Sequence, residues 1–195
     1  MGALTDISAY LIQTVLSLYL LAMLLRFLLQ LVKADFYNPI SQFLVKITSP
    51  LVVPVRKIVP GFGGLDLATL LLSLALQIVA IAAVLMLNGF ALPNPLQLLL
   101  WGVLGLVGLL VNIYFFALLA MIILSWVAPG SSHPAVYLLH QITEPVMAPV
   151  RKIVPPLGGL DFSPIVVFIL INIIQIALGH MAAAIQLPSG LAIGL

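Results

Sequence analysis

Four long apolar runs constrain the fold of this chain more than any other feature. They cover residues 7–32, 67–87, 96–127 and 165–187. Each run is longer than the roughly 20 residues that a helix needs to cross about 30 Å of hydrocarbon. Because 64% of the residues are hydrophobic and only 6% are charged, the chain lacks the polar surface that a soluble domain of this size needs. The sequence therefore predicts an all-α membrane protein with four transmembrane helices.

The third apolar run is longer than one crossing requires. Its length leaves open a tilted helix, an end that protrudes from the membrane, or a break near Gly102, Gly105 and Gly108. The same glycines indicate close contacts between helices, because small residues let two backbones approach each other.

Basic residues lie almost entirely on one side of the predicted helices. Those in the connecting segments are Lys33, Lys46, Arg56, Lys57, Arg151 and Lys152. The N-terminal segment, the turn between the second and third runs, and the C-terminal tail contain no Lys or Arg. Since cytoplasmic loops carry an excess of Lys and Arg, we expect the basic segments in the cytoplasm and both termini outside, in the periplasm.

An internal repeat relates the two halves of the chain. A shift of 95 residues aligns "TSPLVVPVRKIVPGFGGLD" at 48–66 with "TEPVMAPVRKIVPPLGGLD" at 143–161, and 13 of the 19 positions are identical. The same register pairs Pro39 with Pro134. The two copies are residues 1–92 and 93–195, and each is predicted to cross the membrane twice. We therefore expect two parallel helix-loop-helix repeats that are related by a pseudo-two-fold axis along the membrane normal.

Each cytoplasmic segment is predicted to contain a short amphipathic helix. Apolar residues recur at i, i+3, i+4 and i+7, as Ile40, Phe43, Leu44 and Ile47 and then as Ala135, Leu138, Leu139 and Ile142. A helix of eight or nine residues is too short to span, so we expect it to lie at the cytoplasmic interface. Pro50 and Pro145 are expected to end it, and the two "PVRKIVP" stretches are expected to be extended.

A glycine pair and an aspartate follow each of these stretches. The candidates for turns and helix caps are Gly63, Gly64, Asp66, Gly158, Gly159 and Asp161. Glycine permits a tight turn, and an aspartate at an N-cap accepts hydrogen bonds from free backbone N–H groups. The alternative is that the two aspartates line an ion path. Their position at the start of a span, in the same loop as an arginine, favours capping with an ion pair.

Two basic pairs are the candidate lipid- or partner-binding residues: Arg56, Lys57, Arg151 and Lys152. Each basic residue near a membrane surface attracts anionic lipid by about 1 kcal/mol. The alternative is that the pairs only set the orientation of the chain. Orientation requires charge but no fixed distance to prolines and aspartate, so the repeated spacing argues for a further role.

Polar residues within the spans form a second group of candidates. Arg26 lies close enough to the end of the first run to snorkel or to pack against a polar neighbour, and the alternative is a role in gating or substrate binding. Met121 occupies the equivalent position in the second copy, so any such role is confined to the first. Interhelical hydrogen bonds, rather than a transport site, are the expected role of Gln77, Asn112, Asn172 and Gln175.

No sequence motif indicates a catalytic site. The chain has no cysteine, no nucleotide-binding loop, no nucleophile–base pair and no paired catalytic carboxylates. His140 and Glu144 are four residues apart but lack a third metal ligand at a matching spacing. We therefore expect no enzyme activity, no cofactor, no metal and no nucleic-acid partner.

The chain resembles the YggT family of bacterial inner-membrane proteins. The resemblance rests on "LLRFLLQLVKADFYNPISQFLVKITSPLVVPVRKIVPGFGGLD" and "ILSWVAPGSSHPAVYLLHQITEPVMAPVRKIVPPLGGLDFSPI", which share the proline, basic-pair and GGxD pattern. It implies tandem membrane repeats in the inner (plasma) membrane. It also implies a link to osmotic-shock tolerance, potassium homeostasis or a neighbourhood of cell-division genes, and, for plastid relatives, to the assembly of a photosynthetic cytochrome complex.

Two functions are consistent with these features. The first is a membrane scaffold or assembly factor whose paired basic loops contact anionic lipid or partner proteins. The second is a homo-oligomeric channel or transporter that affects potassium or osmolyte balance. The first loop carries four basic and two acidic residues, and a positive cytoplasmic mouth repels potassium. The charge therefore argues against a potassium path, and an anion path would suit it better. The scaffold remains the first hypothesis.

Overall fold

A computed structural model describes residues 2–154 and 161–195 of the chain. Within those residues the chain forms α-helices and no β-strand. The helices are α1 (Ala3–Leu31), α2 (Pro39–Arg56), α3 (Leu67–Leu87), α4 (Pro95–Val127), α5 (Pro134–Ile153) and α6 (Ser163–Ala184). The order of a long helix, a connecting helix and a long helix therefore occurs twice, as the internal repeat predicts.

Four of these helices, α1, α3, α4 and α6, are long and apolar enough to cross a membrane. This confirms the prediction of a multi-pass, all-α membrane protein. The third apolar run forms one continuous helix of 33 residues, so its glycines do not break it. A continuous helix satisfies its backbone hydrogen bonds internally, which hydrocarbon requires.

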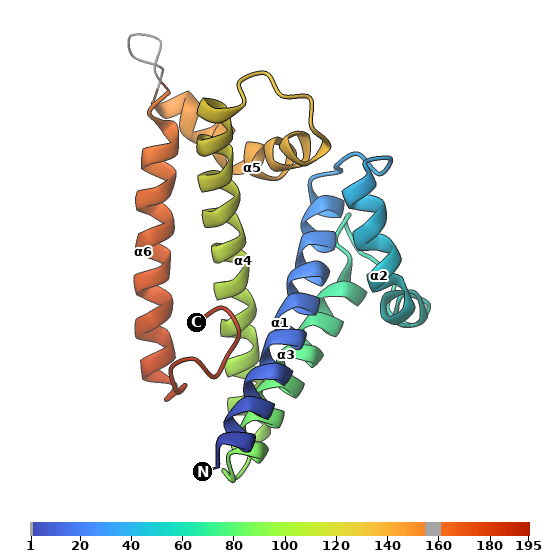
Figure 1. Cartoon of the computed structure of the whole chain (residues 1–195), viewed down its shortest axis with the longest axis vertical. Helices are drawn as coiled ribbons and strands as arrows, with labels where there is room; N and C mark the ends of the chain where they lie inside the picture. Colours follow the sequence, from blue (N-terminus) through green and yellow to red (C-terminus); the bar gives the residue numbers. More distant parts are fainter. Residues whose placement is uncertain (1, 155–160) are drawn as a thin grey trace.

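The long helices pack in sequence-local pairs (Figure 1). Helix α1 packs mainly against α3, α4 packs against α6, and a contact between α3 and α4 joins the pairs. Helices α2 and α5 both lie towards the end of the molecule that is opposite the start of α1. The largest buried apolar cluster joins both halves, because Leu24 and Leu28 of α1 share it with Leu44 of α2 and Leu138 of α5.

The connecting helices are longer than the predicted eight or nine residues. Helix α2 has 18 residues and α5 has 20, and both continue through the prolines that were expected to end them. A proline removes one N–H donor and bends a helix, but it does not have to end one. The buried stripe of Leu44, Thr48 and Val52 continues past Pro50 at a spacing of four, so packing maintains the helix there.

A tight turn precedes α3. Gly63 and Gly64 have φ values of 60° and 87°, and the flanking Phe62 and Leu65 exchange backbone hydrogen bonds of 3.1 and 2.9 Å. Positive φ at both central residues is typical of a two-residue hairpin turn that favours glycine. Gly158 and Gly159, the equivalent pair of the second repeat, lie outside the described residues.

The segment after α6 folds back between the long helices instead of leaving the bundle (Figure 1). Side chains from three helices donate hydrogen bonds to its backbone carbonyls. These bonds are Gln13 Nε2 to Gly190 O (2.8 Å), Gln77 Nε2 to Ile193 O (3.2 Å) and Asn112 Nδ2 to Gly194 O (3.0 Å). Irregular backbone at membrane depth needs such partners, because no water is present to satisfy it. We call residues 187–195 the returning tail.

Glycines make room for the returning tail. A Cβ atom on Gly108 would lie 2.6 Å from the carbonyl oxygen of Gly194, and one on Gly105 would lie 3.0 Å from Cβ of Ala192. Gly194 itself has a φ of 103° and packs against the backbone of α4. The glycines of α4 therefore serve close packing, as expected, although the tail supplies part of the opposing surface.

Candidate functional site

Each repeat contains what we call a basic corner, where the connecting helix ends and the next span begins. The first basic corner consists of Arg56, Lys57 and Asp66, and the second consists of Arg151, Lys152 and Asp161. The arginines lie in the last turns of α2 and α5. A basic residue there interacts favourably with the negative end of the helix dipole.

In the first basic corner the arginine forms internal contacts. The Nη2 group of Arg56 forms an ion pair with Oδ2 of Asp66 and donates to Oε1 of Gln30 at 3.1 Å. Asp66 is buried at the N-cap of α3, where it accepts hydrogen bonds from the Thr69 backbone N–H (3.3 Å) and hydroxyl (2.5 Å). Burial alone opposes the charged form, but the bonds from Thr69 and Arg56 outweigh it and lower the pKa of Asp66. This aspartate is thus an ionised cap that ties α2 to α3.

The second basic corner is more open. Nε of Arg151 lies 3.2 Å from Oδ2 of Asp161, and Nη1 lies 2.8 Å from Oε2 of Glu144. Hydrogen bonding to Glu144 raises the pKa of Arg151. The N-cap of α6 is Phe162, one residue beyond the predicted cap, and Asp161 instead accepts the Ser163 N–H at 2.9 Å. The N-cap shifts because Asp161 accepts from the backbone N–H two residues later, and this bond makes Ser163 the first residue of the helix.

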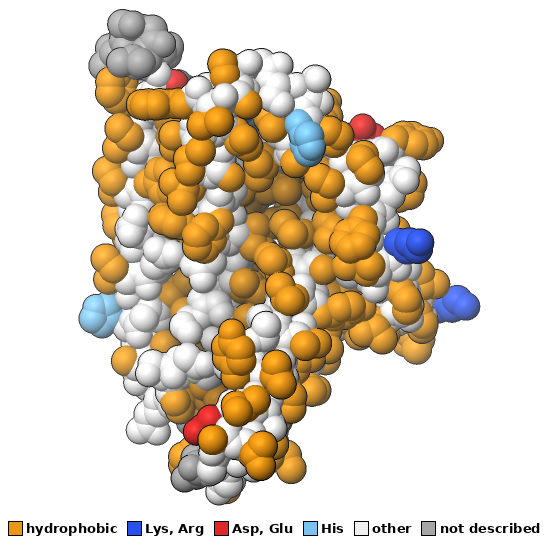
Figure 2. Space-filling model, in the orientation of Figure 1, with side chains coloured by type: hydrophobic (Ala, Val, Ile, Leu, Met, Phe, Trp, Pro, Cys, Tyr) orange, Lys and Arg blue, Asp and Glu red, His pale blue; other side chains and the backbone are white. Residues whose placement is uncertain are grey.

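The lysine of each pair points away from these contacts. Lys57 and Lys152 are exposed, and so are the isoleucines that follow them, with Ile58 82% and Ile153 80% exposed. Figure 2 shows Lys and Arg side chains projecting from the α2 side of a largely hydrophobic surface. Each corner therefore presents one cation beside one large apolar side chain.

Arg26 is buried, with 6% of its surface exposed. Its Nη1 group donates to Oγ1 of Thr48 at 2.7 Å and to Oγ of Ser49 at 3.3 Å. The arginine thus packs against polar groups of α2. In the second repeat the equivalent contact is a hydrogen bond of 3.0 Å from Oγ1 of Thr143 to Sδ of Met121.

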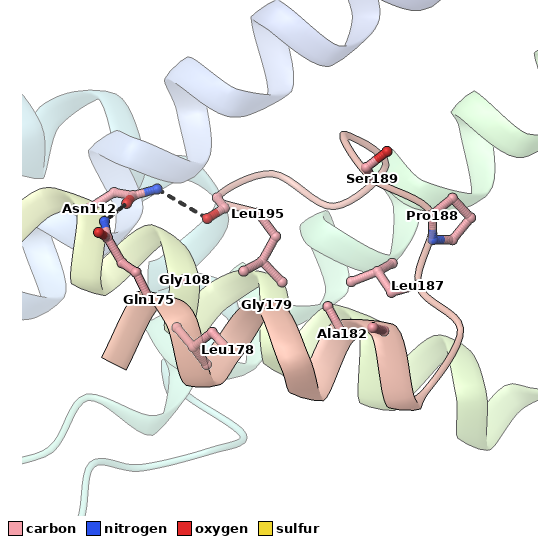
Figure 3. Close-up of a pocket in the computed structure, with 12 residues that line it drawn as sticks. Gly108, Asn112, Gln175, Leu178, Gly179, Ala182, Leu187, Pro188, Ser189 and Leu195 are labelled. Atoms are coloured by element: carbon pink, nitrogen blue, oxygen red, sulfur yellow. Dashed lines mark hydrogen bonds between the residues drawn. The ribbon is translucent and has the colours of Figure 1, made fainter. Parts of the chain in front are cut away.

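Other polar side chains of the spans line a cavity of about 450 Å³ beside the returning tail (Figure 3). Gln175 of α6 donates to Oδ1 of Asn112 of α4 at 2.9 Å, and Asn112 donates in turn to the tail. Among the described residues, Asn172 donates its side-chain hydrogen bond only to the Phe168 carbonyl of its own helix. The interhelical role expected for these amides applies to Gln175 and Asn112, while Gln77 bonds to the tail.

Sequence reasoning missed two contributors to these arrangements. From its spacing, Glu144 is considered only as a possible metal ligand together with His140. In the structure it forms an ion pair with Arg151, which lies two turns further along the same face of α5. No group of three metal-ligating residues occurs in the described part of the chain. Gln13 was also missed, because its partner is a tail carbonyl that no spacing rule identifies.

Comparison with known proteins identifies the family. The sequence profile of the CCB3/YggT family matches residues 5–87 and again residues 100–182. The chain belongs to the CCB3/YggT family. The two matched segments are offset by the same 95 residues that align the internal repeat.

Curated members of the CCB3/YggT family resemble the chain to different extents. An uncharacterized protein of Pseudomonas aeruginosa, PA0392, is 48% identical over 99% of both chains. The uncharacterized protein YggT of Escherichia coli K12 is 36% identical over 90% of both chains. The chloroplast protein CCB3 of Arabidopsis thaliana, which is named for cofactor assembly of complex C, is 33% identical over 36% of this chain and 41% of its own. No solved structure matches.

Proposed function

We propose that this CCB3/YggT protein is a scaffold of the bacterial inner membrane that contacts anionic lipid or partner proteins through its two basic corners. The observation that supports this best is that both repeats pair their arginine with an acidic side chain and leave a lysine and an isoleucine exposed, Lys57–Ile58 and Lys152–Ile153. A cation beside an apolar side chain suits the boundary between headgroups and acyl chains.

The orientation of the chain follows from the same residues. We place both basic corners on the cytoplasmic side and the N-terminus in the periplasm, because Lys and Arg concentrate in cytoplasmic segments. Each lysine near an anionic leaflet contributes about 1 kcal/mol to the binding of the lipid surface, and the two lysines of one protomer add their contributions.

A role in the assembly of membrane complexes, linked to tolerance of osmotic stress, is consistent with this arrangement. The plant relative CCB3 is named for cofactor assembly of a complex. Our chain has two protruding corners of similar composition, which suits contact with membrane-protein partners more than turnover of a substrate.

The channel or transporter alternative is less well supported. Two of the amides that could line a path through the spans, Gln77 and Asn112, donate to the returning tail. No ring of acidic side chains, which cation conduction uses, occurs among the described residues of the spans.

The test is a double charge reversal at the exposed lysines, Lys57→Glu with Lys152→Glu. Purified from membranes in mild detergent, the variant should retain less anionic phospholipid per protein, measured by mass spectrometry, and lose partners that the wild type crosslinks. Lys46→Glu is the matched control for the single variants Lys57→Glu and Lys152→Glu, since each changes net charge equally at one exposed lysine and Lys46 lies outside the corners. Equal lipid and partner retention by the wild type and the corner variant would overturn the proposal.

A further inference from the structure

The first repeat contains a pocket with polar walls that shares only Arg56 with the basic corners. It has a volume of about 370 Å³ and lies between the end of α1, the segment that follows it, and α2. Its polar lining residues are Arg26, Gln30, Lys33, Ser41 and Arg56, and no carboxylate of the described residues lines it. Figure 1 places these elements at the end of the molecule where the connecting helices lie.

Two buried groups in this pocket have unused capacity to donate hydrogen bonds. Arg26 makes its hydrogen bonds through Nη1, which leaves Nε and Nη2 without a partner among the described residues. The hydroxyl of Ser41 is buried in a residue that is 4% exposed, and it has no hydrogen-bond partner in the described part of the chain. A buried donor without an acceptor is costly, so the Ser41 hydroxyl indicates a missing acceptor. The Nε and Nη2 atoms of Arg26 are not fully buried and stay open to the same acceptor.

The charge of the pocket is also unbalanced. Arg56 forms an ion pair with Asp66, which does not line the pocket, but within the described residues Arg26 and Lys33 form no ion pair. A buried guanidinium at this depth is normally paired with an acid or directed to a functional site. The acceptor that fits this pocket is therefore an anion.

Lys33 adds a conformational observation. It follows α1 with a φ of 52°, in the left-handed region where glycine is the usual residue at a helix end. A non-glycine residue in this region is strained, and strain of this kind clusters at functional sites. The lysine is exposed at the mouth of the pocket, where its ammonium group can reach a ligand.

The second repeat supplies an internal comparison. An equivalent pocket of about 450 Å³ is lined there by Met121, Ala128 and Val136, which align with Arg26, Lys33 and Ser41. The fold therefore forms the hollow in both repeats, but Arg26 and Lys33 have uncharged counterparts in the second. The polar lining of the second hollow consists of hydroxyl groups and His140. The positive charge of the first pocket is therefore not a consequence of the fold that the two repeats share.

We propose that the pocket of the first repeat binds a phosphate group, either that of a phospholipid headgroup or free inorganic phosphate. The free Nε and Nη2 of Arg26 can donate side by side to two phosphate oxygens, with Ser41 as a further donor and Lys33 as a point charge at the mouth. The volume lies within the range of small-ligand sites, and Leu29 and Phe36 supply an apolar wall. This site adjoins the first basic corner at Arg56, but it does not include the exposed lysines of the corners, Lys57 and Lys152.

The test measures ligand-dependent thermal stabilisation of the purified full chain in a neutral detergent. The probes are inorganic phosphate and short-chain phosphatidylglycerol, each compared with chloride at the same ionic strength. A ligand that binds only the folded chain raises its unfolding temperature in proportion to occupancy. A shift with the lipid alone assigns the site to a headgroup, a shift with phosphate alone assigns it to the free ion, and no shift with either overturns the proposal.

Variants taken from the second repeat locate the site. Arg26→Met should weaken binding by about tenfold or more, since it removes charge-assisted hydrogen bonds. Methionine makes the equivalent contact at position 121, so the variant should fold. Lys33→Gly should also weaken binding, while it relieves the positive φ and keeps or raises stability without ligand. Lys46→Gln, an exposed cation outside both the pocket and the basic corners, should bind as the wild type does, and equal weakening by all three variants would overturn the proposal.

Discussion

Arg56 and Lys57 are adjacent and carry the same charge, but the helix directs them to different surroundings. A rotation of about 100° per residue turns Arg56 towards Asp66 and leaves Lys57 exposed. The sequence motif predicts a pair of equivalent cations, and only the packing of α2 against α3 separates their roles. Mutations of the two residues are therefore expected to differ in kind, with Arg56 affecting stability and Lys57 affecting surface contacts.

The two aspartates offer a matched comparison of burial. Asp66→Asn is expected to lower the free energy of unfolding by about 1–3 kcal/mol, because a buried carboxylate loses its ion pair with Arg56. Asp161→Asn is expected to change it by less than about 1 kcal/mol, because the pair with Arg151 is exposed. Unfolding in detergent followed by circular dichroism measures both values. A larger effect at Asp161 would contradict the assigned difference in burial.

The same carboxylate predicts a pH dependence. The pKa of Asp66 is lowered in the folded chain, so its contribution to stability is complete above the unfolded pKa of about 3.9 and is lost as pH falls through the folded pKa. Stability should therefore decline in the acid range below about pH 4. The decline should be shallower in Asp66→Asn, as measured by thermal unfolding at a series of pH values. An identical acid decline in the variant would assign it to other groups.

At the scale of elements, local sequence rules succeeded for the spans and failed for the connections. The span Leu67–Leu87 was predicted with the bounds that the structure has, because an apolar run followed by Asn88 and Gly89 leaves little ambiguity. The helix around Pro50 was predicted too short, because the proline rule is local and the buried stripe that overrides it depends on α1 and α3. The returning tail was not predicted at all, since "LPSGLAIGL" has no periodic pattern and its partners lie 82 to 177 residues away.

The packing of the returning tail can be tested at two glycines that line one cavity. Gly108→Ala should displace the tail, because its Cβ would approach the Gly194 carbonyl oxygen to 2.6 Å. Gly179→Ala should leave the tail in place, because no atom of the residues that the structure describes lies within 4 Å of the added Cβ. Hydrogen exchange of residues 187–195, measured by mass spectrometry, should rise in the first variant alone. Equal exchange in the two variants would show that the tail does not depend on this contact.

For the whole molecule, duplication supplies two similar frameworks whose side chains have diverged. Each repeat has a basic corner and a hollow behind its connecting helix, but Arg26 and Met121 give the two hollows different chemistry. The shift of 95 residues revealed the shared framework and the missing counterpart of Arg26. The alignment of the repeats could not show that Lys33 and Ser41 line the same hollow, because their proximity depends on how α2 folds back on α1.

The orientation of the whole chain is open to a direct measurement, because the sequence contains no cysteine. Single cysteines are placed at exposed positions outside the candidate sites, as Leu92→Cys between α3 and α4 and Ser132→Cys between α4 and α5. A membrane-impermeant maleimide applied to spheroplasts should label Leu92→Cys at once and Ser132→Cys only after permeabilisation. The reverse pattern would invert the proposed topology.

The returning tail also has a consequence for the order of biosynthesis. It is synthesised after all four spans, yet it accepts the hydrogen bonds of Gln77 and Asn112. A nascent chain whose helices are already inserted therefore holds amides in hydrocarbon that lack their final partners. Such a chain differs chemically from the folded one, so docking of residues 187–195 is the step that gives these buried amides their partners.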